Sequence, residues 1–258
     1  MPEDKRSGFD NISDEKEMGF LDHLEELRWR IIKVMIGVII GSIVTGIFSD
    51  WIMDNVLLAP ATNSTPPLTL INLKPYGQLV IYTEVILVCG AIISIPNIFY
   101  QIWKFIEPGL LPKERKYASL VVFYSSFCFL AGIAFAYFVM LPTALSFFAG
   151  FGTPAITNNI AIDEYFSFII SVLLAAGVVF ELPMISFFLS KLGILKPKFM
   201  RKYRRHAIVL ILLIAGILTP SPDITSQLLL GIPLLVLYEV SILISKFSQP
   251  KQKFAENN

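Results

Sequence analysis

The chain carries long apolar runs, and their length constrains the fold more than any other feature of the sequence. A helix rises about 1.5 Å per residue, so about 20 apolar residues are needed to cross the roughly 30 Å hydrocarbon core of a bilayer. Four runs approach or exceed that length, over residues 31–49, 77–98, 117–141 and 165–188. Because 55% of the 258 residues are hydrophobic, the chain has more apolar surface than a water-soluble fold normally buries. The sequence predicts an all-α integral membrane protein.

Two further apolar runs, over residues 207–219 and 227–244, are shorter. As a straight helix the first of them would cover only about 20 Å, and its length alone favours a re-entrant or interfacial segment. The bilayer would have to be thinner around a true span of this length. The distribution of positive charge decides between the two interpretations.

Lysine and arginine residues alternate between the segments that six spans leave. With Lys33 counted on the N-terminal side, the seven segments hold 6, 1, 4, 0, 7, 0 and 3 of them. Twenty of the 21 then lie on one side of the membrane, and only Lys74 lies on the other. Positively charged loops stay in the cytoplasm. The sequence therefore predicts six transmembrane helices, the last two short, with both termini cytoplasmic.

The spans form one domain between two polar tails. Residues 1–19 are polar and acidic and have too few apolar side chains to order alone, which predicts a mobile cytoplasmic tail. The transmembrane domain covers residues 20–247. Apolar side chains recur at helical spacing from Phe20 onward, which predicts a short amphipathic helix that runs into the first span. Residues 248–258 form a cytoplasmic C-terminal tail.

Two of the outer connections, the first and the last, are expected to differ. Residues 50–75, which include Pro60, predict a long irregular segment that caps the outer face. The connection between the last two spans, TPSPDITSQ, predicts a short turn. Asp223 or Thr225 is expected to cap the sixth helix there.

Three carboxylates lie within the apolar runs, at Glu84, Glu181 and Glu239. A carboxylate in hydrocarbon is costly unless it is paired, hydrated or neutralised, so each is a functional candidate. Glu181 is the deepest, and Pro183 beside it leaves a backbone carbonyl free. Glu181 either faces a cavity that meets a substrate or a partner helix, or makes a structural hydrogen bond between helices. Glu84 and Glu239 lie nearer the ends of their spans, where snorkelling or a surface ion pair is sufficient.

Acidic residues also occur among the cytoplasmic cations. Glu25 and Glu26 lie in HLEELR, and Glu114 lies in LPKERK. Taken alone, this pattern fits solvated helix charges that pair with Arg28, Arg30 or Arg115. Charge alone does not identify the function.

The sequence gives little support for catalysis. Its two histidines, His23 and His206, lie at membrane edges, and it contains no HExxH, GxSxG or Walker motif. Cys89 and Cys128 lie in apolar runs and offer neither zinc-ligand spacing nor a disulfide framework. A net charge of +1 gives no reason to expect nucleic acid binding. We expect no enzyme activity, no metal and no cofactor.

Seven sequence motifs occur in order along the predicted topology. They are FLDHLEELRWRII, LLAP, IPNIFYQIWKFIEPGLLPKERK, GIAFAYFVMLP, FELP, LTPSPDITSQ and IPLLVLYEVSILISKF. Together, from about Phe20 to Phe247, they resemble the TatC family, the signal-recognising subunit of the twin-arginine protein translocase. Single motifs such as FELP are weak, but seven in register on this topology are specific.

The resemblance implies a concave, single-domain bundle in the cytoplasmic (inner) membrane that binds twin-arginine signal peptides at its cytoplasmic face. With TatA-type and TatB-type single-span partners, such a protein would export folded proteins with proton-motive force and without ATP. It would work in a receptor complex as a homo-oligomer in contact with membrane lipid.

The resemblance also implies roles for individual residues. The family's signal-peptide site maps onto Glu26 and Glu114, with Arg28 and Phe105 close to it. This mapping is chemically sound, because carboxylates accept bidentate, charge-assisted hydrogen bonds from guanidinium groups. Placing both glutamates on one cytoplasmic face would also explain why acids persist among the cations.

Further implied roles lie within the membrane and on its outer side. Glu181 would line a concave face that contacts partner helices or the apolar part of the signal. Gln227 and the sixth span, which includes Glu239, would form part of the docking surface for TatA and TatB. Pro60 would belong to the outer loop that shapes the cavity. The alternative function is a small ion-coupled secondary transporter that uses Glu181 and Glu239 as proton carriers.

Overall fold

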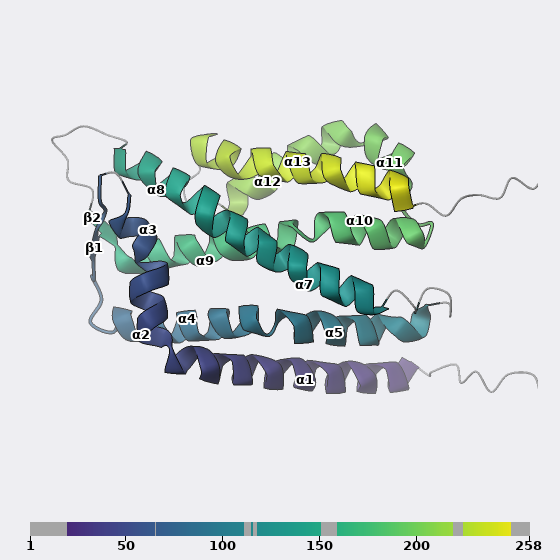
Figure 1. The fold of residues 1–258 in the computed structure, drawn as a ribbon, viewed down its shortest axis with the longest axis horizontal. Coiled ribbons are helices and arrows are strands. Elements are labelled where there is room, and N and C mark those ends of the chain that lie inside the picture. Colours follow the sequence, from purple (N-terminus) through teal and green to yellow (C-terminus); the bar gives the residue numbers. More distant parts are fainter. Residues whose placement is uncertain are drawn as a thin grey trace, which may run out of the picture.

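The computed structural model describes residues 20–64, 66–110, 115, 118–150, 159–218 and 224–248. Helices dominate this part of the chain and run roughly along one long axis (Figure 1). In chain order the elements are α1 (Phe20–Ile47), α2 (Ser49–Ile52), η1 (Met53–Leu57), α3 (Ala59–Thr62), β1 (Thr69–Ile71), α4 (Gly77–Ile93), α5 (Ile95–Ile106), η2 (Glu107–Gly109), α7 (Ala118–Phe135), η3 (Ala136–Met140), α8 (Leu141–Gly150), β2 (Asn159–Ala161), α9 (Ile162–Val179), α10 (Leu182–Lys191), α11 (Pro197–Lys202), α12 (Arg204–Leu218) and α13 (Ile224–Ser248).

Several predictions fall outside the described residues. These are the tail over residues 1–19, all but the first residue of the tail over 248–258, and the candidate residues Glu114 and Asp223. The described ends of α1 and α13 lie at the same end of the molecule, on the right in Figure 1, as an even number of membrane crossings requires.

The apolar runs are helical, but two of them are broken within the membrane. The predicted span over 77–98 consists of α4 and α5, which are bent by 57° relative to each other. Pro96 lies in the first turn of α5 and has no N–H to continue the hydrogen-bond ladder of α4. In the same way α9 ends at Val179 and α10 begins at Leu182, just before Pro183. The apolar runs gave no sign of either interruption, although residues 162–191 still form one segment long enough to cross a membrane.

The first span agrees with its prediction. The amphipathic segment and the apolar run form a single helix, α1, with no break between them. Among the described residues, four helical segments are long and apolar enough to cross a membrane, and the bent pair α4–α5 makes a fifth if it is counted as one span. With 15 residues, α12 is about 22 Å long and falls below that test. The chain is a predominantly helical membrane protein, and the count of six spans stays a prediction.

The outer loop between the first two spans is more ordered than the sequence indicated. Instead of an irregular segment it contains α2, η1, α3 and the short strand β1. β1 pairs in parallel with β2, so that Thr69 lies opposite Asn159 and Ile71 opposite Ala161. Buried tyrosines fix the loop to the bundle, because the Tyr165 hydroxyl donates to the carbonyl oxygen of Leu57 at 2.7 Å. The prediction of irregular structure was wrong because these contacts come from distant parts of the chain.

Small residues allow α1 and α4 to pack closely. A side chain added at Gly90 would overlap the backbone of Ser42, and one added at Gly41 would overlap the carbonyl oxygen of Gly90. The Ser94 hydroxyl donates to the carbonyl oxygen of Gly37 at 2.6 Å, which adds a hydrogen bond between the helices. Close packing of small residues is a main source of helix association where lipid removes the hydrophobic driving force. This glycine seam fixes α1 against α4.

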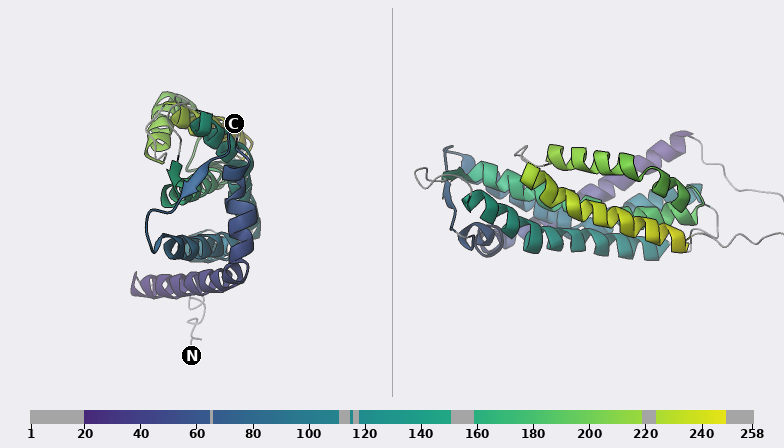
Figure 2. Two further views of the ribbon diagram at one scale, coloured as in Figure 1. Left: turned by 90° about the vertical axis from the view of Figure 1, so that its left-hand side faces the viewer. Right: turned by 90° about the horizontal axis from the view of Figure 1, so that it is seen from above.

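The remaining helices complete an elongated cross-section. In the end-on view of Figure 2, the purple α1 and the yellow-green α12 and α13 lie at opposite edges. Between them α7 packs on α9, and α10 packs on α13. The buried core includes Phe166, Ile169 and Leu141, which are almost fully enclosed. Near the β1–β2 sheet, Lys74 pairs with Asp163 at 2.6 Å, and this hydrogen bond raises the pKa of Lys74.

Candidate functional site

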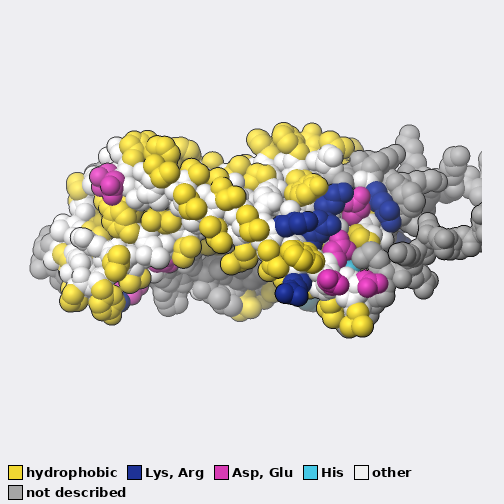
Figure 3. All heavy atoms as spheres, turned by 90° about the horizontal axis from the view of Figure 1, so that it is seen from below, with side chains coloured by type: hydrophobic (Ala, Val, Ile, Leu, Met, Phe, Trp, Pro, Cys, Tyr) yellow, Lys and Arg dark blue, Asp and Glu magenta, His cyan; other side chains and the backbone are white. Residues whose placement is uncertain are grey.

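Charged side chains gather at the end of the molecule where the described ends of α1 and α13 lie. On the face shown in Figure 3, Lys and Arg side chains form a group there together with acidic ones, while hydrophobic side chains cover the middle. This end carries the beginning of α1 and the end of α5, and therefore the motifs HLEELR and WKFIEP. The predicted signal-peptide site lies here.

Glu26 forms an ion pair within α1. The Arg30 guanidinium donates to Glu26 Oε1 from Nη2 at 2.7 Å and from Nε at 3.3 Å. The side chains are 18% and 21% exposed, so this pair is shielded from water more than most helix-surface pairs. The pairing of a cytoplasmic acid with a neighbouring arginine is therefore confirmed for Glu26.

Polar side chains of α5 extend this pair across the helix interface. Arg30 Nη1 donates to Gln101 Oε1 at 3.3 Å, and Gln101 Nε2 donates to Asn97 Oδ1 at 3.3 Å. Asn97 Nδ2 in turn donates to the carbonyl oxygen of Lys33 at 3.2 Å, which returns the chain of hydrogen bonds to α1. Gln101 is buried, at 7% exposed, so its amide depends on these partners. The network holds Arg30 and orients Glu26.

The second oxygen of Glu26 is not used by this network. Glu26 Oε2 has almost no accessible surface and no hydrogen-bond partner within the described chain. A buried acceptor without a donor is destabilising, especially on a charged group. The carboxylate therefore has capacity for a further donor, which can reach it only if the side chain turns or Arg30 moves.

An aromatic contact lies beside this carboxylate. Phe105 of α5 stacks on His23 of α1, with ring centroids 4.3 Å apart and an interplanar angle of 17°. Phe105 thus packs against α1 at His23, three residues before Glu26. Arg28 is exposed, and Glu26 pairs with Arg30 in its place.

The loop after α5 is described only in part. Glu114 lies outside the described residues, so the structure gives no distance between it and Glu26. Its neighbour Arg115 donates to the carbonyl oxygens of Leu110 at 3.1 Å and Pro108 at 3.3 Å. Arg115 thus binds backbone carbonyls, which holds this end of the loop close to η2.

Glu181 is buried where α9 ends. It is 6% exposed, lies against Ser125 and Phe129 of α7, and its Oε1 has no hydrogen-bond partner among the described residues. Within this chain the placement favours the contact between helices over an open cavity. An acid with an unpaired oxygen can still meet a polar group of a partner.

The other candidates within the membrane make contacts of their own. Glu239 forms an ion pair with Arg204 at 2.6 Å, with both side chains about half exposed, which confirms the surface ion pair considered for it. Gln227 Nε2 donates to the carbonyl oxygen of Leu212 at 2.7 Å and holds α13 to α12. Glu84 is partly buried on α4. Glu181 and Glu239 have different partners, Ser125 of α7 for the first and Arg204 of α12 for the second.

Pro60 is buried in α3, in the outer loop where the sequence placed it. Among the described residues, no three His, Cys, Asp or Glu side chains are grouped closely enough to hold a metal ion. The sequence interpretation missed Gln101 and Asn97. Their signal was available, because two amide side chains four residues apart in an apolar helix lie on one face and need partners.

Comparisons with known proteins agree with this architecture. The family described as "Sec-independent protein translocase protein (TatC)" matches residues 22–233. The protein of that name from Carboxydothermus hydrogenoformans is 40% identical over 93% of this chain and 97% of its own length. The one from Aquifex aeolicus is 37% identical over 92% of this chain and 98% of its own length.

The solved structures give the same result. A crystal structure described as "Twin Arginine Translocase Receptor- TatC" superposes with a TM-score of 0.78 at 37% identity. The superposition covers 88% of this chain and 99% of that one. Sequence and fold therefore agree over most of both chains, and the protein described here belongs to the TatC family.

Proposed function

We propose that this chain is the signal-reading subunit of a twin-arginine translocase in the cytoplasmic (inner) membrane. Its family consists of protein translocase components and not of enzymes. In this proposal the chain crosses the membrane six times and both termini lie in the cytoplasm. The positive-inside distribution of Lys and Arg supports this topology. TatA-type and TatB-type partners would then use the proton-motive force to export the folded protein whose signal this subunit has bound.

The observation that carries the proposal is the guanidinium already bound to Glu26. Two donors of Arg30 meet one oxygen of this carboxylate, and Gln101 holds the same guanidinium from the other side. The surroundings of Glu26 therefore suit an arginine side chain. A visiting arginine of the signal would take the place of Arg30 or add to it through Oε2, and Glu114 would receive the second arginine.

Glu26→Gln tests this proposal, because it keeps the shape of the side chain and removes its charge. Losing charge-assisted hydrogen bonds worth about 1.5–3 kcal/mol should weaken binding of a twin-arginine peptide roughly 10- to 100-fold. Glu25→Gln is the matched control, since Glu25 is the adjacent, exposed residue and loses the same charge. Binding is measured with the purified full-length chain and a fluorescent twin-arginine peptide, with its twin-lysine variant beside it.

Glu114→Gln is the second arm of this test and should weaken binding to a similar degree. The proposal fails if Glu26→Gln binds the peptide as tightly as Glu25→Gln, or if wild type binds twin-lysine and twin-arginine peptides equally. A dependence of transport on Glu181 and Glu239, with no dependence on Glu26, would favour the ion-coupled transporter instead.

A further inference from the structure

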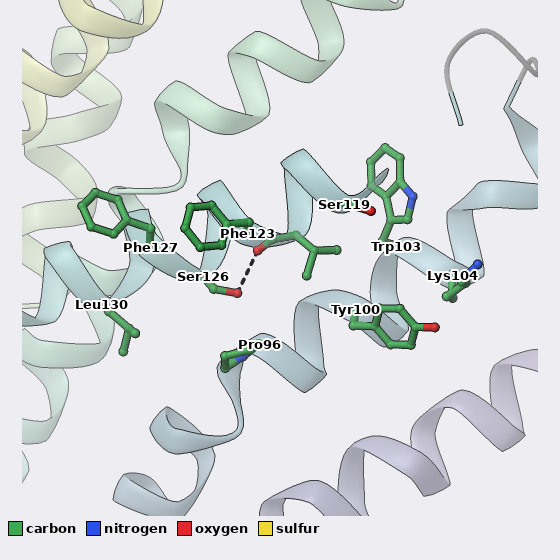
Figure 4. Close-up of a pocket in the computed structure, with 10 residues that line it drawn as sticks. Pro96, Tyr100, Trp103, Lys104, Ser119, Phe123, Ser126, Phe127 and Leu130 are labelled. Carbon is green, nitrogen blue, oxygen red and sulfur yellow. Dashed lines mark hydrogen bonds between the residues drawn. The ribbon is translucent and has the colours of Figure 1, made fainter. Parts of the chain in front are cut away.

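A groove of about 710 Å³ lies between α5 and α7 (Figure 4). Its volume falls within the usual range for small-molecule sites. Neither the candidate signal site nor any residue predicted from the sequence uses it. Its lining residues are Pro96, Tyr100, Trp103, Lys104, Ser119, Val122, Phe123, Ser126, Phe127 and Leu130.

The groove is polar at one end and apolar at the other. Figure 4 shows Lys104 and the hydroxyl of Tyr100 at one end, while Phe127 and Leu130 lie at the opposite end. The polar end belongs to the last turns of α5, beside the charged end of the molecule. A ligand that fits this gradient is an amphiphile with its polar group at the cytoplasmic surface.

The length of the groove matches one leaflet of a bilayer. Along α7 its lining extends from Ser119 to Leu130, which is about 16 Å at the rise of an α-helix. This is about half of the roughly 30 Å hydrocarbon core. A transmembrane partner helix or a second copy of the chain would need a contact surface over the whole thickness. The dimensions favour a molecule confined to the cytoplasmic leaflet.

The side chains around the groove open it toward lipid. Phe123 is 66% exposed and Phe127 is 63% exposed, while Ser126 beneath them is buried. An acyl chain can therefore enter sideways from the bilayer and lie between the two helices. Basic pockets between transmembrane helices on the cytoplasmic side are known to bind phospholipid head groups.

We propose that this groove binds one phospholipid of the cytoplasmic leaflet. Its phosphate is held by the Lys104 ammonium, and an acyl chain lies along Val122, Phe127 and Leu130. Lys104 also pairs with Glu107 at 2.7 Å, but an ammonium group has three donors and binds a phosphate oxygen beside that carboxylate. The bound lipid fills the space between α5, which carries Phe105, and the start of α7.

Ser126→Phe tests the proposal by placing a ring in the groove. The Ser126 hydroxyl donates to the carbonyl oxygen of Val122 in its own helix, so the substitution removes no hydrogen bond between helices. Thr83→Phe is the matched control, because Thr83 also donates to a carbonyl oxygen four residues before it and is exposed on α4, away from the groove. The full-length chain is purified in detergent, mixed with dioleoyl phosphatidylglycerol and examined by native mass spectrometry.

Wild type and Thr83→Phe should retain one phospholipid more than Ser126→Phe does. Lys104→Gln, which leaves the groove open, should bind phosphatidylglycerol roughly fivefold more weakly, as expected for one lost polar contact. Lys246→Gln, a change at an exposed lysine of α13, should leave binding unchanged.

Equal retention by wild type and Ser126→Phe would overturn the proposal, and so would an equal loss in Thr83→Phe. If Ser126→Phe keeps its lipid but no longer crosslinks to the apolar part of a signal peptide, the groove is a peptide site and the phospholipid is excluded. The lipid-binding experiment is done without signal peptide. Its result therefore does not depend on whether the proposed receptor function is correct.

Discussion

The glycine seam between α1 and α4 makes a sharp prediction about stability. In Gly90→Ala the new Cβ would lie 2.6 Å from the Cα of Ser42, and the backbone nitrogen of Ser42 would be 2.5 Å away. Neither backbone atom can move without shifting α1 as a whole. An ordinary contact begins at 3.4 Å, so the helices must separate by about 0.9 Å to relieve the shorter of these two contacts.

The magnitude follows from this displacement. A gap of about 0.5–1 Å forfeits a quarter to a half of the dispersion attraction between the atoms that it separates. Overpacking of this kind typically lowers the free energy of unfolding by about 1–3 kcal/mol. The higher helix propensity of alanine offsets up to about 1 kcal/mol of this loss. We expect Gly90→Ala to lower the free energy of unfolding by about 1–2 kcal/mol.

Gly46→Ala is a control within the same interface. A Cβ at Gly46 would find only Ile86 Cδ1, at 3.9 Å, which is ordinary van der Waals contact. This variant keeps the gain in helix propensity without a clash, so it should be neutral or stabilising by up to about 1 kcal/mol.

The two variants are compared by equilibrium unfolding in mixed micelles, with circular dichroism as the readout. Equal free energies of unfolding for Gly90→Ala and Gly46→Ala would show that α1 is free to shift and would refute the close packing described here. Loss of signal-peptide affinity in Gly90→Ala alone would add that the position of α1 controls the geometry around Glu26.

Two further predictions use the same unfolding measurement. Glu239→Ala should change the free energy of unfolding by less than about 1 kcal/mol, because its ion pair with Arg204 is half exposed; a loss above twice that value would contradict this. Tyr165→Phe should cost about 1–2 kcal/mol, because it leaves the carbonyl oxygen of Leu57 without its buried donor. Tyr203→Phe, at an exposed tyrosine, is its control, and equal losses in the two variants would show that the buried hydrogen bond contributes little.

Hydropathy and charge were sufficient to predict the class of fold and most of the helices. Apolar runs and the alternation of Lys and Arg are local signals, and the structure confirms a helical membrane protein whose two described ends lie together. The break before Pro96 was also visible locally, since proline cannot continue the hydrogen-bond ladder. It was missed because the apolar run continues through it.

The remaining features depend on contacts between distant residues. The pairing of β1 with β2 joins segments about 90 residues apart, and three-residue strands carry no periodic signal of their own. The hydrogen bond between Arg30 and Gln101 likewise joins residues that are 71 positions apart in the sequence. Glu26 could be selected from the sequence because of the motif around it, but its orientation by Gln101 required the fold.

The short parallel sheet of β1 and β2 sets where the bundle can pivot. β1 lies a few residues before α4 and β2 runs directly into α9, so their pairing ties the outer ends of these two helices together. With 18 residues, α9 is a lever arm of about 27 Å, and a tilt of about 10° against α4 would displace its far end by about 5 Å. Any rocking of the two halves is therefore smallest at the end that holds the sheet and largest at the opposite end, which carries Glu26 (Figure 1).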